Sequence, residues 1–253
     1  GMMRALGIGA ALFGLALSAV PAMAQETPPL PHVYWSFEGP FGTIDQAAAQ
    51  RGYQVYKQVC SACHSMTQMH FRELAGIGYT TNQIKAIAAS VKVPGPPNAQ
   101  GQRSPVPGKP ADAFPSPFPT EAAAKAVFNG AVPPDQSLLA NALGPTYIYA
   151  ILNGYRNPPS SVTVPPGRYY NIYFPSDVIA MPPPLHDGAV KYADGTPATV
   201  PQMAHDVATF LYFVANPHVD QRKRIGVHVV LFLVFITGLT YALKRKVWSD
   251  VDH

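Results

Sequence analysis

Both cysteines of this chain stand in one short motif, Cys60-Ser61-Ala62-Cys63-His64. Two thiols three residues apart, followed at once by a histidine, form the attachment signature of a c-type haem. The two thiols can bond the two vinyl groups of one porphyrin, and the adjoining histidine is then held under the iron. The motif therefore predicts one covalently bound haem c, attached through Cys60 and Cys63, with His64 as the proximal iron ligand.

Other uses of the two cysteines are less consistent with the sequence. A structural zinc site needs four ligands, and beyond Cys60, Cys63 and a candidate such as His70 there is no second cysteine pair. A redox dithiol usually begins a helix in a strand–helix–strand setting, whereas this pair follows a predicted helix. A disulfide closed within four residues is less favourable still. The sequence therefore favours haem attachment over metal binding or thiol chemistry.

The distal side of the iron needs a second ligand if the haem is to transfer electrons, and a methionine there raises its potential. The candidates beyond the N-terminal region are Met66, Met69, Met181 and Met203, with His186 and His205 as histidine alternatives. Met66 and Met69 lie too close to His64 in sequence to reach the opposite haem face. Met203 falls in a predicted helix. Met181 precedes three prolines, whose fixed φ angles can hold a thioether in place, so Met181 is the preferred ligand.

The two ends of the chain carry targeting signals. Residues 1–24 have one charge, an apolar run and the small-residue sequence Ala22-Met23-Ala24, which together predict a cleaved export signal. An uncleaved anchor is the alternative, although the run is short for a membrane span. Ile225–Leu243 has 19 residues without a formal charge and three cations on each side, which predicts a transmembrane helix. The predicted parts are a signal peptide (1–24), a periplasmic haem domain (25–221), an anchor (222–246) and a cytoplasmic tail (247–253).

The basic character of the chain belongs to these ends. The net charge is +4 and the isoelectric point is near 9.0, values that by themselves suggest an acidic partner. However, seven of the 18 basic residues are Arg4 and the six cations beside the apolar run, which leaves 11 basic against 12 acidic residues in 25–221. The middle of the chain is therefore mildly acidic, and nucleic-acid binding is not expected.

The middle region alternates helical patterns with long irregular stretches. Apolar spacing and capping residues predict helices over 43–59, 81–91, 120–128, 147–152 and 199–215. In the last of these, Thr199 and Gln202 have the spacing of a capping box. Residues 94–119 and 157–184 are rich in proline yet contain aromatic residues, so we expect ordered loops rather than flexible linkers. No alternating strand pattern is strong, which predicts a mainly α fold with long proline-rich loops and one C-terminal transmembrane helix.

Several stretches together resemble the cytochrome c1 family, the haem subunits of ubiquinol–cytochrome c reductase. They are Arg51–Cys60 leading into the haem motif, Asn129–Asp135 (NGAVPPD), Tyr173–Pro175 followed by Ile179–Met181, Asp194–Thr199 (DGTPAT), and Arg222–Arg224 before the anchor. The resemblance covers residues 43–249 approximately. It implies Cys60 and Cys63 as thioether attachments, His64 as the proximal ligand and Met181 as the distal ligand. One departure is Lys125, which stands where the family commonly has an arginine paired with a haem propionate.

The resemblance also implies a function. A member of this family takes one electron from the Rieske iron–sulfur protein and passes it to a c-type cytochrome, while cytochrome b oxidises the quinol. Such a chain is a redox subunit and not an enzyme on its own. It would lie in a bacterial inner membrane, in a complex that the resemblance suggests is dimeric. The alternatives are a membrane-anchored haem enzyme of the peroxidase kind and a haem-free thiol or metal-delivery protein.

Overall fold

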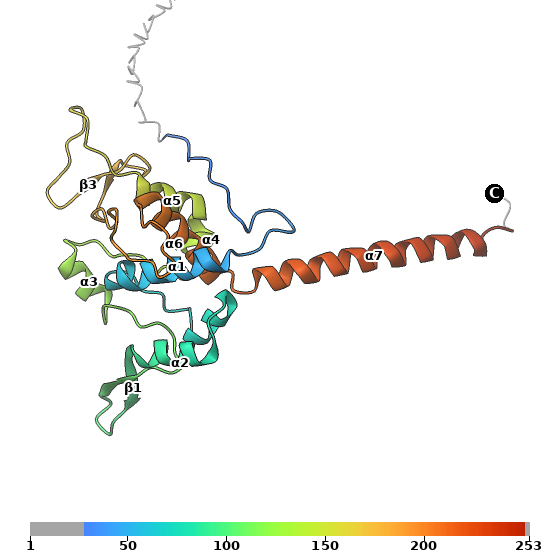
Figure 1. The fold of residues 1–253 in the computed structure, drawn as a ribbon, viewed down its shortest axis with the longest axis horizontal. Helices are drawn as coiled ribbons and strands as arrows, with labels where there is room; N and C mark the ends of the chain where they lie inside the picture. The colour runs from blue at the N-terminus through green and yellow to red at the C-terminus, as the bar shows by residue number, and fades with distance from the viewer. Residues whose placement is uncertain (1–27, 251–253) are drawn as a thin grey trace, which may run out of the picture.

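The computed structural model describes residues 28–250. A body of helices and long loops lies at one end, and a single long helix projects from it (Figure 1). The predicted export signal and the last three residues of the predicted tail lie outside the described residues.

The elements of the described residues are mostly short helices, with two pairs of short strands between them. In chain order they are α1 (Gln46–Gln58), η1 (Cys60–Ala62), η2 (Phe71–Ile77), α2 (Thr81–Ala89), β1 (Lys92–Pro97), β2 (Arg103–Pro107), α3 (Glu121–Val127), α4 (Leu139–Leu143), α5 (Pro145–Asn153), β3 (Tyr169–Tyr170), β4 (Val178–Ile179), α6 (Val200–Ala215) and α7 (Val219–Val247). The predicted mainly α class is confirmed. The five predicted helices of the middle region correspond to α1, α2, α3, α5 and α6, whereas the short helix α4 was not predicted.

Polar side chains begin the helices where the sequence indicated. Asp45 accepts a hydrogen bond from the N–H of Ala48 at the start of α1, and Thr120 does the same for Ala123 at the start of α3. These side chains satisfy N–H groups that have no partner within the helix. At α6, Thr199 accepts from the N–H of Gln202. The side chain of Gln202 instead donates to Asp206 at 3.0 Å, so only half of the predicted capping box forms.

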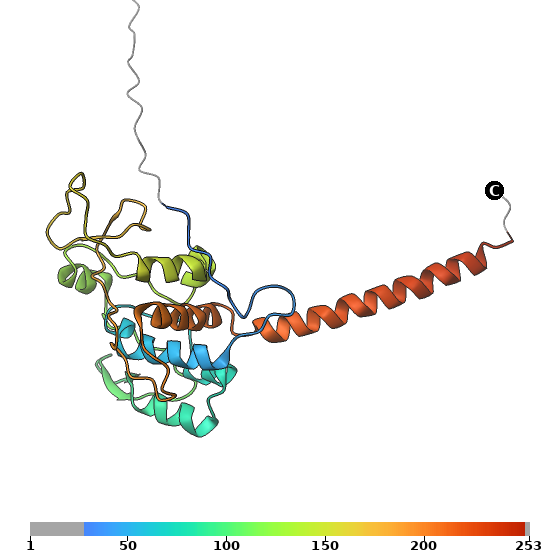
Figure 2. The same cartoon turned by 45° about the horizontal axis from the view of Figure 1, so that its top comes forward.

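Helices α1 and α6 cross in close contact in the middle of the body, where both views place them side by side (Figures 1 and 2). Gly52 makes this approach possible, because a Cβ atom there would lie 2.0 Å from the carbonyl oxygen of Asp206. Beside it, the guanidinium of Arg51 donates two hydrogen bonds to the buried Asp206 carboxylate, at 2.9 and 3.1 Å. A third reaches Asp194 at 2.9 Å. Hydrogen bonding to Asp206 raises the pKa of Arg51 above its usual value.

Aromatic side chains fill the core around this crossing. Tyr53 and Tyr56 of α1 pack against Phe210 of α6, with ring centroids 5.5 and 5.9 Å apart. The same two tyrosines contact Phe114 edge-on. Phe114 follows the proline-rich hairpin and packs against Phe71 in a tilted arrangement, with ring centroids 4.2 Å apart. Burying rings of this size contributes much of the stability of a small core, and it also orders the proline-rich stretch that contributes Phe114.

Two small antiparallel sheets form within the long loops, although no strong strand pattern was found there. Strand β1 pairs with β2, and β3 pairs with β4. The first pair contains prolines on both strands, for example Pro94 opposite Pro105. Proline removes a donor from a sheet and is tolerated on edge strands. A two-stranded sheet consists only of edges, which explains why proline-rich segments could pair.

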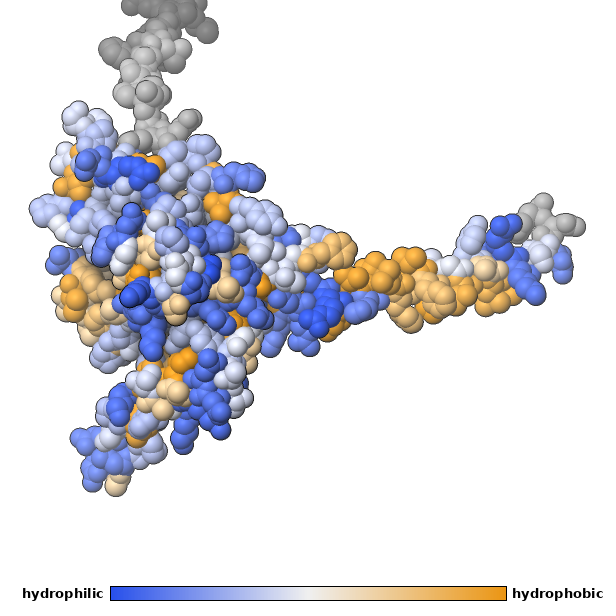
Figure 3. Space-filling view, in the orientation of Figure 1, coloured by the Kyte–Doolittle hydropathy of each residue, from blue (hydrophilic) through white to orange (hydrophobic). Residues whose placement is uncertain are grey.

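Helix α7 projects away from the body, and its surface is hydrophobic along most of its length (Figure 3). Its 29 residues correspond to about 44 Å at the usual rise of ~1.5 Å per residue, enough to cross a bilayer core of ~30 Å. The predicted transmembrane helix is therefore confirmed by length and composition. The helix begins earlier than expected, at Val219. The side chain of Val219 is buried in the core of the body.

Replacing Gly52 by alanine tests the helix crossing. Alanine is intrinsically better than glycine in a helix by roughly 1 kcal/mol, but at Gly52 the added methyl group meets backbone atoms of α6. We expect Gly52→Ala to lower the free energy of unfolding by about 1–3 kcal/mol, measured by chemical denaturation of the haem-loaded chain in detergent.

Gly226→Ala is the matched control, because Gly226 also lies in a helix and has open space around it. This variant should leave the unfolding of the body unchanged. If Gly52→Ala proved as stable as the parent chain, the crossing would tolerate more space than the structure gives it.

Candidate cofactor-attachment site

The Cys60–His64 motif lies on a tight turn at the end of α1. The N–H groups of Cys63 and His64 both donate to the carbonyl oxygen of Cys60, at 3.1 and 2.9 Å. Residues three apart share one side of such a 3₁₀ turn, so the two sulfurs leave the backbone in similar directions. Both cysteines are free, and each residue taken as a whole is partly exposed. The turn therefore offers two thiols from one short piece of backbone, as attachment to a single planar group requires.

The imidazole of His64 is held in one orientation by a distant loop. Its Nδ1 atom lies 2.9 Å from the carbonyl oxygen of Pro134. A carbonyl can only accept a hydrogen bond, so Nδ1 carries the proton and Nε2 keeps a free lone pair. Burial lowers the pKa of His64, which favours the neutral ring. A neutral imidazole whose second nitrogen donates to a carbonyl is the usual state of a histidine that ligates a metal.

The loop that holds His64 is itself fastened to the residues after the motif. The N–H of Gln136 donates to the carbonyl of Ser65 at 2.8 Å. The carboxylate of Asp135 accepts from the N–H and the hydroxyl of Thr67, at 2.9 and 2.8 Å, and from the N–H of Ser137. Burial alone would raise the pKa of Asp135, but the hydrogen bonds from Ser137 and Thr67 hold it well below its usual value. We call this set of hydrogen bonds, which holds the loop at 134–137 against residues 65–67, the clamp. Asp135 is its centre.

Two features of the thiols' surroundings favour haem attachment over the alternative chemistries. Burial raises the pKa of the Cys60 thiol to about 12, whereas redox and metal-binding cysteines act as thiolates and usually have a lowered pKa. Within residues 28–250, no group of three or more His, Cys, Asp or Glu side chains is arranged to hold a metal ion. His70, the additional zinc ligand considered from sequence, instead lies 3.7 Å from Glu73.

Met181 lies on a loop that is ordered by hydrogen bonds. The hydroxyl of Tyr155 donates to the carbonyl oxygen of Met181 at 3.0 Å. Asn171 is completely buried and donates to the carbonyl of Ile151 at 2.7 Å, which ties the loop to α5. Gly154 allows this contact, because a Cβ atom there would lie 2.4 Å from the Asn171 side-chain oxygen. The 157–184 stretch is therefore an ordered loop, as predicted, and its contacts hold the backbone of Met181.

Apart from His186, the other candidate distal ligands are buried or stacked elsewhere in the body. Met66, Met69 and Met203 are buried in the hydrophobic core, so Met181 is the one methionine among residues 28–250 whose side chain is partly exposed. His205 stacks on Trp35 with ring centroids 4.7 Å apart. His186 is exposed, with its Nδ1 3.1 Å from the carbonyl oxygen of Asp187.

Lys125 projects from α3, on the segment that leads into the His64-holding loop. Its ammonium lies 3.8 Å from the carboxylate of Glu121, and its side chain is 53% exposed. Such an exposed pair contributes little energy, so the ammonium can leave it at small cost. A contact of Lys125 with a haem propionate stays a prediction.

The residues present fit a c-type haem. The thiols share one turn, His64 presents Nε2, and apolar side chains are exposed on α3, α4 and the segment between them: Val127, Val132, Leu138 and Leu143. Such side chains are costly to leave in water and suit contact with an apolar ring system.

The sequence predicts the residues that would bond the haem, but it does not indicate the residues that hold them in place. Pro134 and Asp135 were noted only as part of a family motif, and the roles of Tyr155 and Asn171 were not foreseen. A proline pair followed by an aspartate does suggest a rigid, hydrogen-bonded turn. No signal in the sequence indicated that this turn would meet His64.

This chain is similar to known proteins over most of its length. The sequence model of the cytochrome C1 family matches residues 35–251. A Bradyrhizobium diazoefficiens protein named cytochrome b/c1 is 46% identical over 240 residues, 85% of this chain, and this chain spans 35% of that protein's length. The cytochrome c1-2 heme protein of Solanum tuberosum mitochondria is 43% identical over 248 residues, covering 96% of this chain and 95% of its own. Cytochrome c1 of Rhodospirillum rubrum is 43% identical and covers 87% of each chain.

Replacing Asp135 by alanine tests the clamp around His64. The change leaves the N–H groups of Thr67 and Ser137 without their acceptor, so we expect the free energy of unfolding to fall by about 1–3 kcal/mol. Glu121→Gln is the control, because it removes an exposed carboxylate whose single ion pair contributes little. Denaturant unfolding of both variants checks this. Equal stability of the two would mean that Asp135 does not hold the loop.

Proposed function

Because this chain belongs to the cytochrome c1 family, we propose that it is the membrane-anchored electron-transfer subunit of a ubiquinol–cytochrome c reductase. Proteins of this family carry a covalently bound haem c. The observation that carries the proposal is the arrangement of the motif: two thiols on one turn, followed by a histidine whose Nδ1 is fixed by Pro134 and whose Nε2 is free.

The residues of the site have separate roles in this proposal. Cys60 and Cys63 would hold the haem through thioether bonds, and the Nε2 atom of His64 would ligate the iron. Met181 would supply the second iron ligand, and its backbone is restrained by the Tyr155 hydrogen bond and by the three prolines that follow. When bound, haem c supplies a one-electron iron couple. Nothing in this chain needs to act as a general acid, base or nucleophile.

A methionine in the distal position distinguishes electron transfer from haem catalysis. A peroxidase-like enzyme needs an open coordination position for its substrate. Met181 lies on a loop whose backbone is tied to α5 through Asn171 and to Tyr155. A ligand on an anchored loop loses little entropy on binding the iron, which supports a closed haem and a role as a redox subunit.

The partners follow from this role. We propose that the haem takes one electron from the mobile Rieske iron–sulfur protein and passes it to a c-type cytochrome. Quinol oxidation belongs to cytochrome b, and the complex is a dimer. The name cytochrome b/c1 of the Bradyrhizobium relative supports the association with cytochrome b. The mildly acidic composition of residues 25–221 suits an electron acceptor with a basic surface.

The orientation in the membrane is part of the proposal. The bacterial relatives and α7 support a membrane-anchored protein. We place the haem domain in the periplasm and the C-terminal end in the cytoplasm, because haem c is attached outside the cytoplasmic membrane in bacteria. Lys125 remains the candidate for a propionate contact.

The distal ligand can be tested by replacing Met181 with leucine, which has similar volume and no sulfur. We expect loss of the methionine–iron charge-transfer band and a fall in the midpoint potential of roughly 0.1 V or more, within the ~0.8 V span that axial ligands set.

Met203→Leu is the matched control, because Met203 is buried in the core and away from this role; its band and potential should not change. An unchanged pyridine haemochrome spectrum in both variants shows that haem is still attached. If Met181→Leu kept the band and the potential, the distal ligand would be another residue.

Membership of the complex can be tested by purification. Affinity purification of the tagged chain from its native membranes in mild detergent should recover cytochrome b and the Rieske protein in equal amounts. Both should be absent from a control purification of the untagged strain. Recovery of a stable, solitary haem protein would contradict the proposed complex while leaving the haem site intact.

A further inference from the structure

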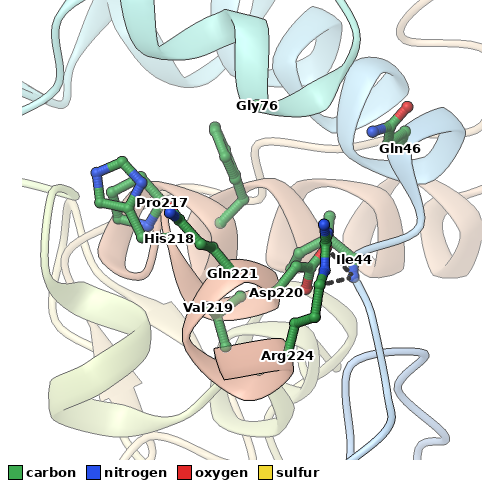
Figure 4. A pocket seen from close by; sticks show the side chains of 10 residues that line it. Ile44, Gln46, Gly76, Pro217, His218, Val219, Asp220, Gln221 and Arg224 are labelled. Atoms are coloured by element: carbon green, nitrogen blue, oxygen red, sulfur yellow. Dashed lines mark hydrogen bonds between the residues drawn. The ribbon is translucent and has the colours of Figure 1, made fainter. Parts of the chain in front are cut away.

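The N-terminal segment is fastened to the first turns of α7 at two points. The ammonium of Lys223 donates hydrogen bonds to the carbonyl oxygens of Phe37 and Gly42, the latter at 3.0 Å. Both carboxylate oxygens of Asp220 lie 3.2 Å from the N–H of Ile44 (Figure 4). Residues 37–44 therefore form a loop closed against the start of α7, which we call the anchor loop.

The base of the anchor loop is rigid. The carbonyl of Trp35 accepts a hydrogen bond from the N–H of Glu38, and the carbonyl of Ser36 accepts one from Thr43. The ring of Phe37 is 4% exposed and stacks on Tyr212 of α6 at 3.7 Å. These contacts fix where the tip of the loop lies relative to α7.

The tip of the anchor loop exposes a large apolar side chain. Phe41 is 80% exposed, although Phe37 at the base of the same loop is buried. Its neighbours Gly39, Pro40 and Gly42 are uncharged, and the charged Glu38 stands at the base. A single exposed apolar side chain is common on a protein surface, but this one stands on an uncharged tip that is held beside the start of the apolar run of α7. The tip is therefore suited to an apolar environment.

The position of the loop indicates what that environment is. Lys223, which holds the loop, is two residues before Ile225, where the uncharged run of α7 starts. In both ribbon views the N-terminal segment loops out beside the first turns of α7 (Figures 1 and 2). The space-filling view shows hydrophobic atoms on this loop next to the hydrophobic length of the helix (Figure 3). The tip is thus held beside the point where the uncharged run of α7 begins.

We propose that Phe41 inserts into the interfacial region of the lipid bilayer beside α7. Aromatic rings are favoured at this depth, where an apolar side chain meets the headgroup boundary. One helix alone leaves the body free to tilt, whereas a second contact beside it restricts that tilt. The anchor loop would in this way help to fix the orientation of the body relative to the membrane.

Spin labelling of the full-length, haem-loaded chain tests the proposal. In that chain Cys60 and Cys63 are consumed by the haem, so Phe41→Cys provides a single site for a nitroxide. In nanodiscs of phosphatidylcholine and phosphatidylglycerol, the label's collision rates with oxygen and with a water-soluble nickel chelate are measured. The ratio of oxygen to nickel-chelate collisions should be several-fold higher for the Phe41→Cys label than for a label at Gln100→Cys. Gln100 is exposed at the turn between β1 and β2, in the body and away from α7.

A second variant tests whether the Lys223 hydrogen bonds set the depth of the anchor-loop tip in the bilayer. Lys223→Met removes both hydrogen bonds to the loop while keeping an unbranched side chain, and it should shift the Phe41→Cys label toward the accessibility of the Gln100→Cys label. An unchanged haem spectrum shows that the body is still folded.

Two results would overturn the proposal. One is a Phe41→Cys label as accessible to the nickel chelate as the Gln100→Cys label. The other is a label shielded from both reagents, in nanodiscs or in material purified with cytochrome b, because that result assigns the tip to a protein contact. Neither result depends on the identity of the electron donor or acceptor.

Discussion

The close crossing of α1 and α6 is the contact on which the rest of the structure depends. Gly52 lets the two backbones meet, and Arg51 neutralises the buried carboxylate of Asp206 at the same place. A carboxylate buried without a partner would be strongly destabilising, so the ion pair and the glycine act together. Helix α1 ends in the cofactor motif, and α6 leads within four residues into α7. One crossing thereby joins the redox site to the membrane anchor.

The site depends on loops that come from distant parts of the chain. Pro134 fixes the His64 ring from 70 residues away, and Asp135 ties the same loop to the residues that follow the motif. Tyr155 and Asn171 hold the backbone around Met181 in the same manner. Hydrogen bonds of this kind restrict the movement of His64 and of the backbone at Met181, and such restricted surroundings suit electron transfer.

Much of the fold could be predicted because its signals are local. Thr120 and Thr199 begin helices as expected, and the uncharged run after Ile225 lies within a continuous helix. The short strands could not be predicted, since Pro94 and Pro105 argue against a sheet unless each strand is known to be an edge. Helix α4 was missed because five residues are too few to show a helical period.

The sequence alone determined the chemistry, because Cys60, Cys63 and His64 are contiguous and their spacing is itself the signature of haem attachment. It also determined the anchor, because an uncharged run between cations needs no tertiary context to be recognised. Only the tertiary structure decided that Pro134 leaves the Nε2 atom of His64 free and that Tyr155 holds the backbone of Met181. It also decided that Lys223 donates hydrogen bonds to the N-terminal segment. These facts depend on contacts between residues 26 to 186 positions apart, and such contacts leave no periodic or local pattern in a single sequence.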